Sequence, residues 1–150
     1  MTRRYFFMLA VSLLALPASI APAQQQERLY EQVRSSAVEI LVDRRLAGCG
    51  CIVDPAGLVL TAAHVVKNAR MRIEVNSSTT GRVQGTLLAI DAAHDLALLK
   101  LPSGVKAANC LRLAKRPPTA GDTIFLYGSP LFRHDVMVRG MAARSQTTFE

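Results

Sequence analysis

The chain has 150 residues, with 18 Lys and Arg against 11 Asp and Glu, and a formal net charge of +7 at pH 7. The basic residues are scattered and few aromatic residues accompany them, whereas a nucleic-acid-binding surface usually has a basic stripe or patch. We therefore expect no nucleic-acid partner and attribute the charge to a solvated surface.

The first 23 residues have the pattern of an export signal. A basic pair at residues 3–4 precedes an apolar run over residues 5–16, and Ala21-Pro22-Ala23 is a small-residue cleavage site. An uncleaved membrane anchor is disfavoured, because prolines interrupt a stretch shorter than the roughly 20 residues that a spanning helix needs. We expect cleavage after Ala23, a periplasmic or secreted product, and no membrane contact once the signal is removed.

A short helix and six strands are predicted next. Residues 24–36 place Leu29, Tyr30 and Val33 at helical spacing, which predicts a short amphipathic helix. Short runs rich in Val, Ile and Leu follow, separated by turn residues, and predict strands over residues 37–42, 47–53, 58–61, 71–75, 82–90 and 96–101. Strands at such spacing are typical of an all-β fold, here an antiparallel barrel over residues 37–101.

Turn and connector residues complete this organisation. Asp54-Pro55-Ala56-Gly57 predicts a tight hairpin, and the polar segment 76–81 predicts a second one. Residues 102–122, with three prolines and two glycines, predict a connector over the surface. Two further strands, over residues 123–127 and 135–142, cannot form a core alone and are interpreted as the start of a second barrel over residues 123–150.

Three cysteines, Cys49, Cys51 and Cys110, remain after signal cleavage, so at least one thiol lies outside any intramolecular disulfide. Cys49 and Cys51 lie two apart in a predicted strand, where a bridge between them has poor geometry. A bridge from Cys110 to either one stays open. A zinc site using Cys49, Cys51 and His64 lacks a fourth ligand at a familiar spacing. We interpret the cysteines as small buried apolar residues and expect no metal or organic cofactor.

One histidine and one aspartate are candidates for chemistry. His64 follows an apolar strand and two alanines, and Asp95 opens a second apolar strand. A buried carboxylate bonded to one imidazole nitrogen fixes the tautomer and stabilises the imidazolium that forms when the other nitrogen takes a proton. Asp95 fits this role, because a carboxylate among apolar residues is unfavourable unless it is paired. We expect His94 to point the opposite way from Asp95 and to be exposed, and we expect His134 to be solvated.

Two strings of the sequence are specific to one family. They are Gly-Cys-Gly-Cys-Ile-Val-Asp-Pro-Ala-Gly-Leu-Val-Leu-Thr-Ala-Ala-His-Val-Val from residue 48 and Ala-Ile-Asp-Ala-Ala-His-Asp-Leu-Ala-Leu-Leu-Lys from residue 89. The first resembles the catalytic-histidine segment of trypsin-like serine peptidases, nearest the bacterial Deg/HtrA branch, and the second resembles that branch's catalytic-aspartate segment. With Gly121-Asp and Tyr127-Gly-Ser-Pro, the resemblance covers residues 36–144. Val65 stands where animal relatives carry a cysteine, so their histidine-loop disulfide cannot form.

This resemblance implies two six-stranded barrels, with polypeptide substrates bound in the cleft between them and only the first barrel complete here. It implies that His64 is the general base and acid and that Asp95 orients it. The serine expected in a Gly-Asn/Asp-Ser-Gly-Gly loop has no counterpart among these residues. Ser129 comes in the right order, but it lacks glycines that would aim backbone N–H groups at an oxyanion, and it matches a different family position.

Three interpretations of function stay open. The first is an exported trypsin-like serine endopeptidase, of which this chain is an N-terminal portion. The second is a catalytically inactive, short relative that binds polypeptides or a partner protein. The third is a β-barrel binding module without peptidase ancestry. Nothing in the sequence indicates the oligomeric state.

Overall fold

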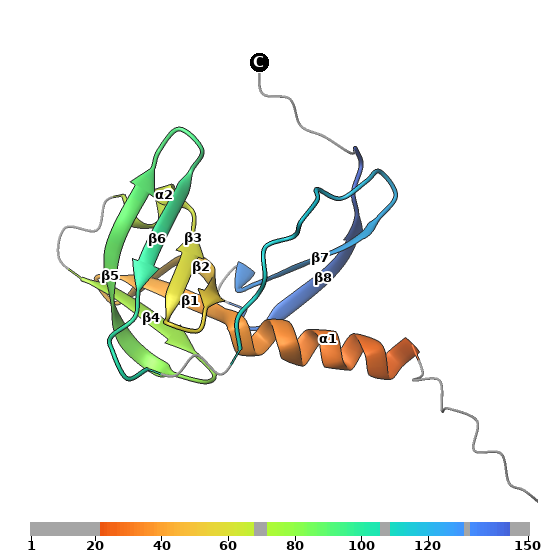
Figure 1. The fold of residues 1–150 in the computed structure, drawn as a ribbon. Coiled ribbons are helices and arrows are strands. Elements are labelled where there is room, and N and C mark those ends of the chain that lie inside the picture. Colours follow the sequence, from red (N-terminus) through yellow and green to blue (C-terminus); the bar gives the residue numbers. More distant parts are fainter. Residues whose placement is uncertain (1–21, 68–71, 106–108, 131–132, 145–150) are drawn as a thin grey trace, which may run out of the picture.

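The computed structural model describes residues 22–67, 72–105, 109–130 and 133–144, which form a closed barrel, a two-stranded sheet and two helices (Figure 1). The elements are α1 (Pro22–Ser36), β1 (Ala37–Val42), β2 (Arg45–Asp54), β3 (Leu58–Thr61), α2 (Ala63–Val66), β4 (Ile73–Ser77), β5 (Gly81–Asp91), β6 (Leu96–Lys100), β7 (Thr123–Gly128) and β8 (Val136–Met141). The predicted all-β barrel is confirmed. The predicted export signal lies outside the described residues except for its last two, where α1 begins.

The six barrel strands pair in the order β1-β2-β3-β6-β5-β4, and β4 closes the ring by pairing with β1. Every pair is antiparallel, and β3 and β6, which are far apart in the chain, are direct neighbours through Thr61↔Ala97 and three further residue pairs. This adjacency matters for the site, because the segment after β3 and the segment before β6 then meet at one end of the barrel.

Two tight turns show how local sequence fixes the register. Asp43 and Arg44, between β1 and β2, both have positive φ (50° and 68°), as the commonest two-residue hairpin requires. In the predicted Asp54–Gly57 turn, the Gly57 N–H donates to the Asp54 carbonyl at 2.9 Å and the Ala56 N–H donates to Asp54 Oδ1 at 2.7 Å. Gly57 has φ +82°, which favours glycine at that position. The predicted hairpin is confirmed.

The barrel interior is filled by aliphatic side chains from alternate positions of the strands. Ile40, Ile52, Val59, Val75 and Leu99 are completely buried there. Burial of each such side chain contributes about 1.5–3 kcal/mol. This packing holds the strand ends in place, and the candidate site is built on those ends.

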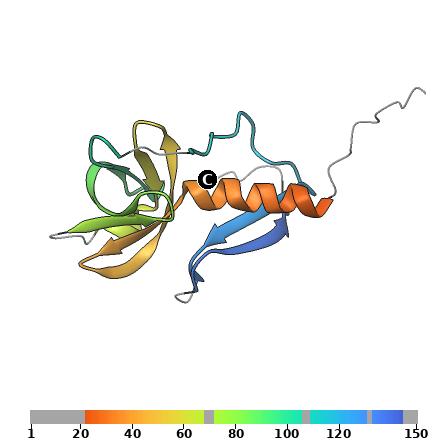
Figure 2. The ribbon, with the colours of Figure 1, turned by 90° about the horizontal axis from the view of Figure 1, so that it is seen from below.

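The hairpin β7–β8 lies beside α1, outside the barrel (Figures 1 and 2). The Tyr30 ring of α1 packs against the Tyr127 ring of β7, with centroids 5.8 Å apart. Large apolar side chains of the hairpin remain exposed, namely Ile124, Leu126, Val138 and Met141. Two strands alone cannot enclose a core, in agreement with the interpretation of this hairpin as part of a larger unit.

The cysteines differ in part from expectation. All three thiols are free, so Cys110 forms no disulfide with Cys49 or Cys51. None of the three is fully buried. Burial nevertheless raises the pKa of the Cys51 thiol. Within the described ranges, no group of three His, Cys, Asp or Glu side chains is arranged to hold a metal ion. Within the same ranges, no helix has the length and apolarity needed to cross a bilayer.

Candidate active site

His64 lies on α2, a single helical turn that the sequence pattern did not predict. β3 ends at Thr61, whose hydroxyl donates to the Cys49 carbonyl at 2.9 Å. Ala62 is extended (φ −81°, ψ 144°), and the helix begins at Ala63. Ala62 has no polar side chain to cap the helix, so the first backbone N–H groups of α2 need an acceptor from elsewhere in the chain.

Asp95 supplies that acceptor and also holds the histidine ring. Its carbonyl accepts from the Ala63 N–H at 3.1 Å, and its Oδ1 accepts from the His64 N–H at 2.8 Å. Its other carboxylate oxygen, Oδ2, lies 2.7 Å from Nδ1 of the His64 ring. One aspartate therefore caps α2 and orients the imidazole, and the two predicted site residues are brought together.

The environment of Asp95 differs from the expected one. Asp95 lies in the turn before β6 with φ 55°, rather than opening the strand. Its side chain is 52% exposed and that of His64 is 62% exposed, so the expectation of a buried carboxylate is wrong. The backbone N–H of His64, followed by the His64 ring, lowers the pKa of Asp95, so the carboxylate is ionised at neutral pH. With Nδ1 facing a carboxylate, Nε2 is the nitrogen that can accept a proton.

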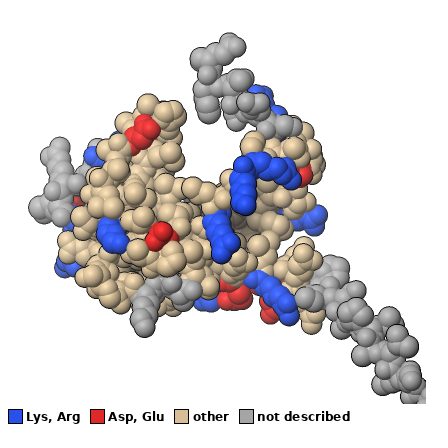
Figure 3. Space-filling model, in the orientation of Figure 1, with Lys and Arg blue, Asp and Glu red and all other residues tan. Residues whose placement is uncertain are grey.

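An apolar groove of about 500 Å³ reaches Asp95. It runs between the barrel and β7, and its lining includes Asp95, Leu96, Leu60, Phe125 and Leu126. Figure 3 shows the molecule hollowed between the barrel and the hairpin, with Lys and Arg side chains in separate places on this face. The groove therefore lies next to the carboxylate that faces the His64 ring.

The comparisons with known proteins bear on the family. The family model of the trypsin-like peptidase domain matches residues 48–148. The chain belongs to this family. Serine protease HTRA4 of Mus musculus is 28% identical over 144 residues, which are 96% of this chain and 28% of that protein. Serine protease HTRA1A of Danio rerio is 30% identical over 129 residues, which are 85% of this chain and 26% of that protein.

A solved structure agrees with this assignment. The MamO protease domain from Magnetospirillum magneticum, in its apo form, superposes with a TM-score of 0.62 at 26% identity, covering 75% of this chain and 62% of that one. The predicted resemblance to trypsin-like peptidases of the HtrA kind is thus confirmed. This trypsin-like chain spans only about a quarter of the length of the HtrA relatives that it matches.

Gly48 on β2 packs closely against Val65 on α2, and this contact leaves no room for a larger side chain at residue 48. A Cβ added at Gly48 would lie 2.6 Å from Cγ2 of Val65, the residue after His64. We expect Gly48→Ala to lower the free energy of unfolding by about 1–3 kcal/mol, because the added methyl group must push α2 outward. Val65→Ala should restore part of that loss when combined with it. Urea denaturation of the single and double variants measures both effects.

Gly140→Ala is the matched control, since its Cβ would meet only Ile124 at an ordinary 3.7 Å. Equal destabilisation by the two glycine substitutions, or strictly additive effects of Gly48→Ala and Val65→Ala, would contradict the packing argument.

Ser129 does not take part in the His64 site. Its hydroxyl donates to Glu39 Oε1 at 2.7 Å, and its N–H donates to the Cys49 sulfur at 3.3 Å. Among the described residues, no serine hydroxyl is hydrogen-bonded to the His64 ring. The geometry agrees with the sequence-based argument against Ser129 as the nucleophile.

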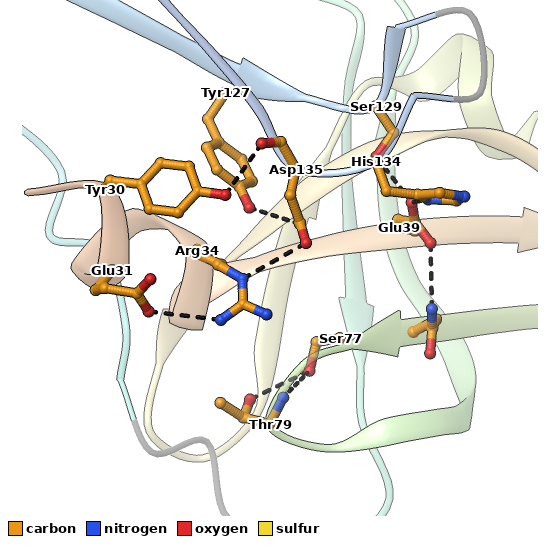
Figure 4. A network of polar contacts seen from close by, with 11 residues as sticks. Tyr30, Glu31, Arg34, Glu39, Ser77, Thr79, Tyr127, Ser129, His134 and Asp135 are labelled. Carbon is orange, nitrogen blue, oxygen red and sulfur yellow. Dashed lines mark hydrogen bonds and ion pairs between the residues drawn. The ribbon is translucent and has the colours of Figure 1, made fainter. Parts of the chain in front are cut away.

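A second polar network, which sequence reasoning missed, joins the barrel to the hairpin (Figure 4). Glu39 on β1 is its centre: Oε1 accepts from Ser129 and pairs with Nδ1 of His134, and Oε2 accepts from Asn76 at 3.1 Å. His134 was expected to be solvated; its ring is exposed, but it is paired with a carboxylate. His94 is exposed, as expected, and its ring lies 2.7 Å from Asp91.

Asp135, next to His134, extends this network to α1. Its Oδ1 accepts from the Tyr127 hydroxyl at 2.6 Å, its Oδ2 accepts from Arg34 Nε at 3.5 Å, and its carbonyl accepts from the Tyr30 hydroxyl at 3.2 Å. Burial, and then the hydrogen bond to Asp135, raise the pKa of Tyr127. Tyr127 is therefore a neutral donor at every physiological pH.

The Glu39–His134 pair predicts a pH-dependent attachment of the hairpin. Hydrogen bonding and charge attraction from Glu39, with a smaller contribution from Asp135, raise the pKa of His134. Burial alone would raise the pKa of Glu39, but hydrogen bonds from His134, Ser129 and Asn76 outweigh it and lower that pKa. The pair therefore stabilises the fold above the ordinary pKa of glutamate and below that of histidine, roughly pH 4.5–6.5.

The stabilisation should disappear as pH rises through the raised pKa of His134, and also as pH falls through the lowered pKa of Glu39. A double-mutant cycle of Glu39→Gln and His134→Ala, followed by urea denaturation, measures the coupling energy. We expect a favourable coupling near pH 6 that vanishes near pH 9. A coupling that stays constant over that range would contradict the charged-pair interpretation.

Proposed function

We propose that this chain supplies the general base and its orienting carboxylate to the active site of a Ser-His-Asp endopeptidase acting on polypeptides. The observation that carries the proposal is the 2.7 Å contact between His64 Nδ1 and Asp95 Oδ2, made while Asp95 also caps the helix that bears His64. The names of the HTRA4 and HTRA1A relatives, both serine proteases, support the same reaction class.

In the proposed reaction, Nε2 of His64 takes the proton of a serine hydroxyl while the serine oxygen attacks the carbonyl carbon of a peptide bond. Asp95 stabilises the imidazolium that forms. The imidazolium then gives its proton to the departing amine nitrogen, leaving an acyl-enzyme ester. Water repeats the sequence: His64 takes a proton from water, the hydroxide oxygen attacks the ester carbonyl, and the proton returns to the serine oxygen as the acid leaves.

The serine and the oxyanion-binding N–H groups would come from a segment outside these 150 residues. The chain matches only 28% of HTRA4, and no glycine-flanked serine of the expected kind occurs in it. We also propose that residues 1–23 direct export to the periplasm or outside the cell. We further propose that the first barrel spans residues 37–101 and that a second barrel starts near residue 123. The basic, apolar and small-residue pattern of the first 23 residues supports the export proposal.

The test compares two polypeptides on a denatured, fluorescently quenched protein substrate. The polypeptide that carries this segment together with a glycine-flanked serine should hydrolyse the substrate, and His64→Ala should abolish that hydrolysis. The 150-residue chain alone should show no hydrolysis that depends on His64. Turnover by the short chain, or an inactive longer polypeptide, would overturn the proposal; an inactive form that binds the substrate would instead identify a polypeptide-binding relative.

A further inference from the structure

The turn that carries Asp95 has an unusual shape. Asp91 and Leu96 are the last paired residues of β5 and β6, so residues 92–95 form a four-residue loop at the end of this hairpin. Asp95, the last residue of that loop, has φ 55°, a left-handed conformation that few residues other than glycine adopt readily. The contacts of Asp95 with α2 depend on this shape, because both its carbonyl and its carboxylate must face the first turn of the helix.

Asp91 holds the loop from inside. Its Oδ1 accepts from the Ala93 N–H at 3.0 Å and from the His94 N–H at 3.2 Å, and its Oδ2 lies 2.7 Å from Nδ1 of the His94 ring. The Ala93 and His94 N–H groups belong to the two residues directly before Asp95. The His94 ring, and then the His94 N–H, lower the pKa of Asp91, so its carboxylate is a charged acceptor at neutral pH.

Two aspartates therefore shape this turn in succession, Asp91 at the end of β5 and Asp95 in the loop. Asp91 folds the backbone over residues 93–94, and that fold sets the direction of Asp95, whose oxygens bind Ala63 and His64. We propose that Asp91 is a positioning residue for the His64–Asp95 pair. It acts through backbone geometry, and its negative charge is not itself required at the site. This inference rests on the proposed peptidase function.

Two substitutions separate geometry from charge. Asp91→Asn removes the charge but keeps an oxygen at the Oδ1 position, so it should preserve the loop. Asp91→Glu keeps the charge but moves the oxygens one methylene further out, so it should release the Ala93 and His94 N–H groups. Asp91→Ala should resemble Asp91→Glu. Asp54→Ala is the matched control, because Asp54 makes the same kind of turn contact, to Ala56, in the β2–β3 hairpin.

The first measurement uses the chain itself and needs no enzymatic activity. The Nδ1–H proton of His64, held by Asp95, should give a low-field NMR resonance in the wild type and in Asp91→Asn. In Asp91→Glu and Asp91→Ala, this proton should exchange with solvent at least about tenfold faster. Asp54→Ala should leave its exchange rate unchanged. A wild type without the resonance would count against the proposed function. A wild-type resonance that Asp91→Glu leaves unaffected would overturn only the positioning role.

The second measurement uses the complete peptidase. A displacement of about 1 Å in a catalytic group lowers turnover by about 10²-fold. We expect Asp91→Glu to lower kcat by about that factor with little change in KM, and Asp91→Asn to stay within a fewfold of wild type. The opposite order, with Asn damaging and Glu harmless, would show that the charge of Asp91 matters rather than the loop shape, and would overturn the inference.

Discussion

Replacing Asp95 with asparagine is expected to lower kcat of the proposed peptidase by about 10⁴-fold while the fold remains intact. The asparagine oxygen can still accept from the His64 N–H, now 2.8 Å from Oδ1, so the capping of α2 persists. The amide NH₂ would replace Oδ2, 2.7 Å from Nδ1 of the ring, and it cannot accept a hydrogen bond from Nδ1–H. The ring then favours the tautomer with its proton on Nε2, which cannot serve as a base.

Steady-state hydrolysis, with thermal unfolding followed by circular dichroism, measures both parts of this prediction. Asp95→Ala should lose activity and also stability, because it removes the capping oxygen as well. Asp54→Asn, in a turn that takes no part in the site, is the control and should retain wild-type kcat. An Asp95→Asn enzyme that keeps more than a tenth of wild-type kcat would exclude the orienting role of Asp95.

Leu99→Ala is expected to lower the free energy of unfolding by about 2–5 kcal/mol. The Leu99 side chain is 0% exposed and lies in the barrel core, on β6 between Val59 of β3 and Leu87 of β5. Its truncation leaves a cavity that the hydrogen-bonded ring of strands cannot easily close. Because small domains are stable by only about 5–15 kcal/mol, this loss is a large fraction of the total.

Leu88→Ala is the matched control, since Leu88 is the same residue type on the neighbouring strand and is 54% exposed. Its effect should stay within about 0.5 kcal/mol. Urea denaturation at equal protein concentration gives both values. Similar losses for the two variants would show that the β3–β6–β5 side of the barrel is not tightly packed.

Most of the barrel could be predicted from local patterns. Runs of Val, Ile and Leu between turn residues located all six strands, with boundaries within two residues of those observed. The Asp54–Gly57 turn was predictable because each turn position demands a particular residue type. The pairing of His64 with Asp95 was suggested by a carboxylate next to an apolar strand, but only the family resemblance made it specific, since 31 residues separate the two and no periodicity links them.

The features that escaped prediction depend on contacts between distant residues. α2 has four residues, too few for a helical period, and it is capped by a residue from another turn. The left-handed conformation of Asp95 follows from the contacts of Asp91, which a strand-like pattern conceals. Glu39 and His134 are 95 positions apart, and each resembles an ordinary surface residue in the sequence.

Direct pairing of β3 with β6 has a consequence for how this architecture tolerates change. His64 comes just after β3 and Asp95 just before β6. The paired residues of these two strands set the distance between His64 and Asp95. The intervening polypeptide turns back at residues 78–80, at the tip of the β4–β5 hairpin. Insertions or deletions at that tip can accumulate across related genes without changing the distance in space between His64 and Asp95, because neither residue is held in place by the tip.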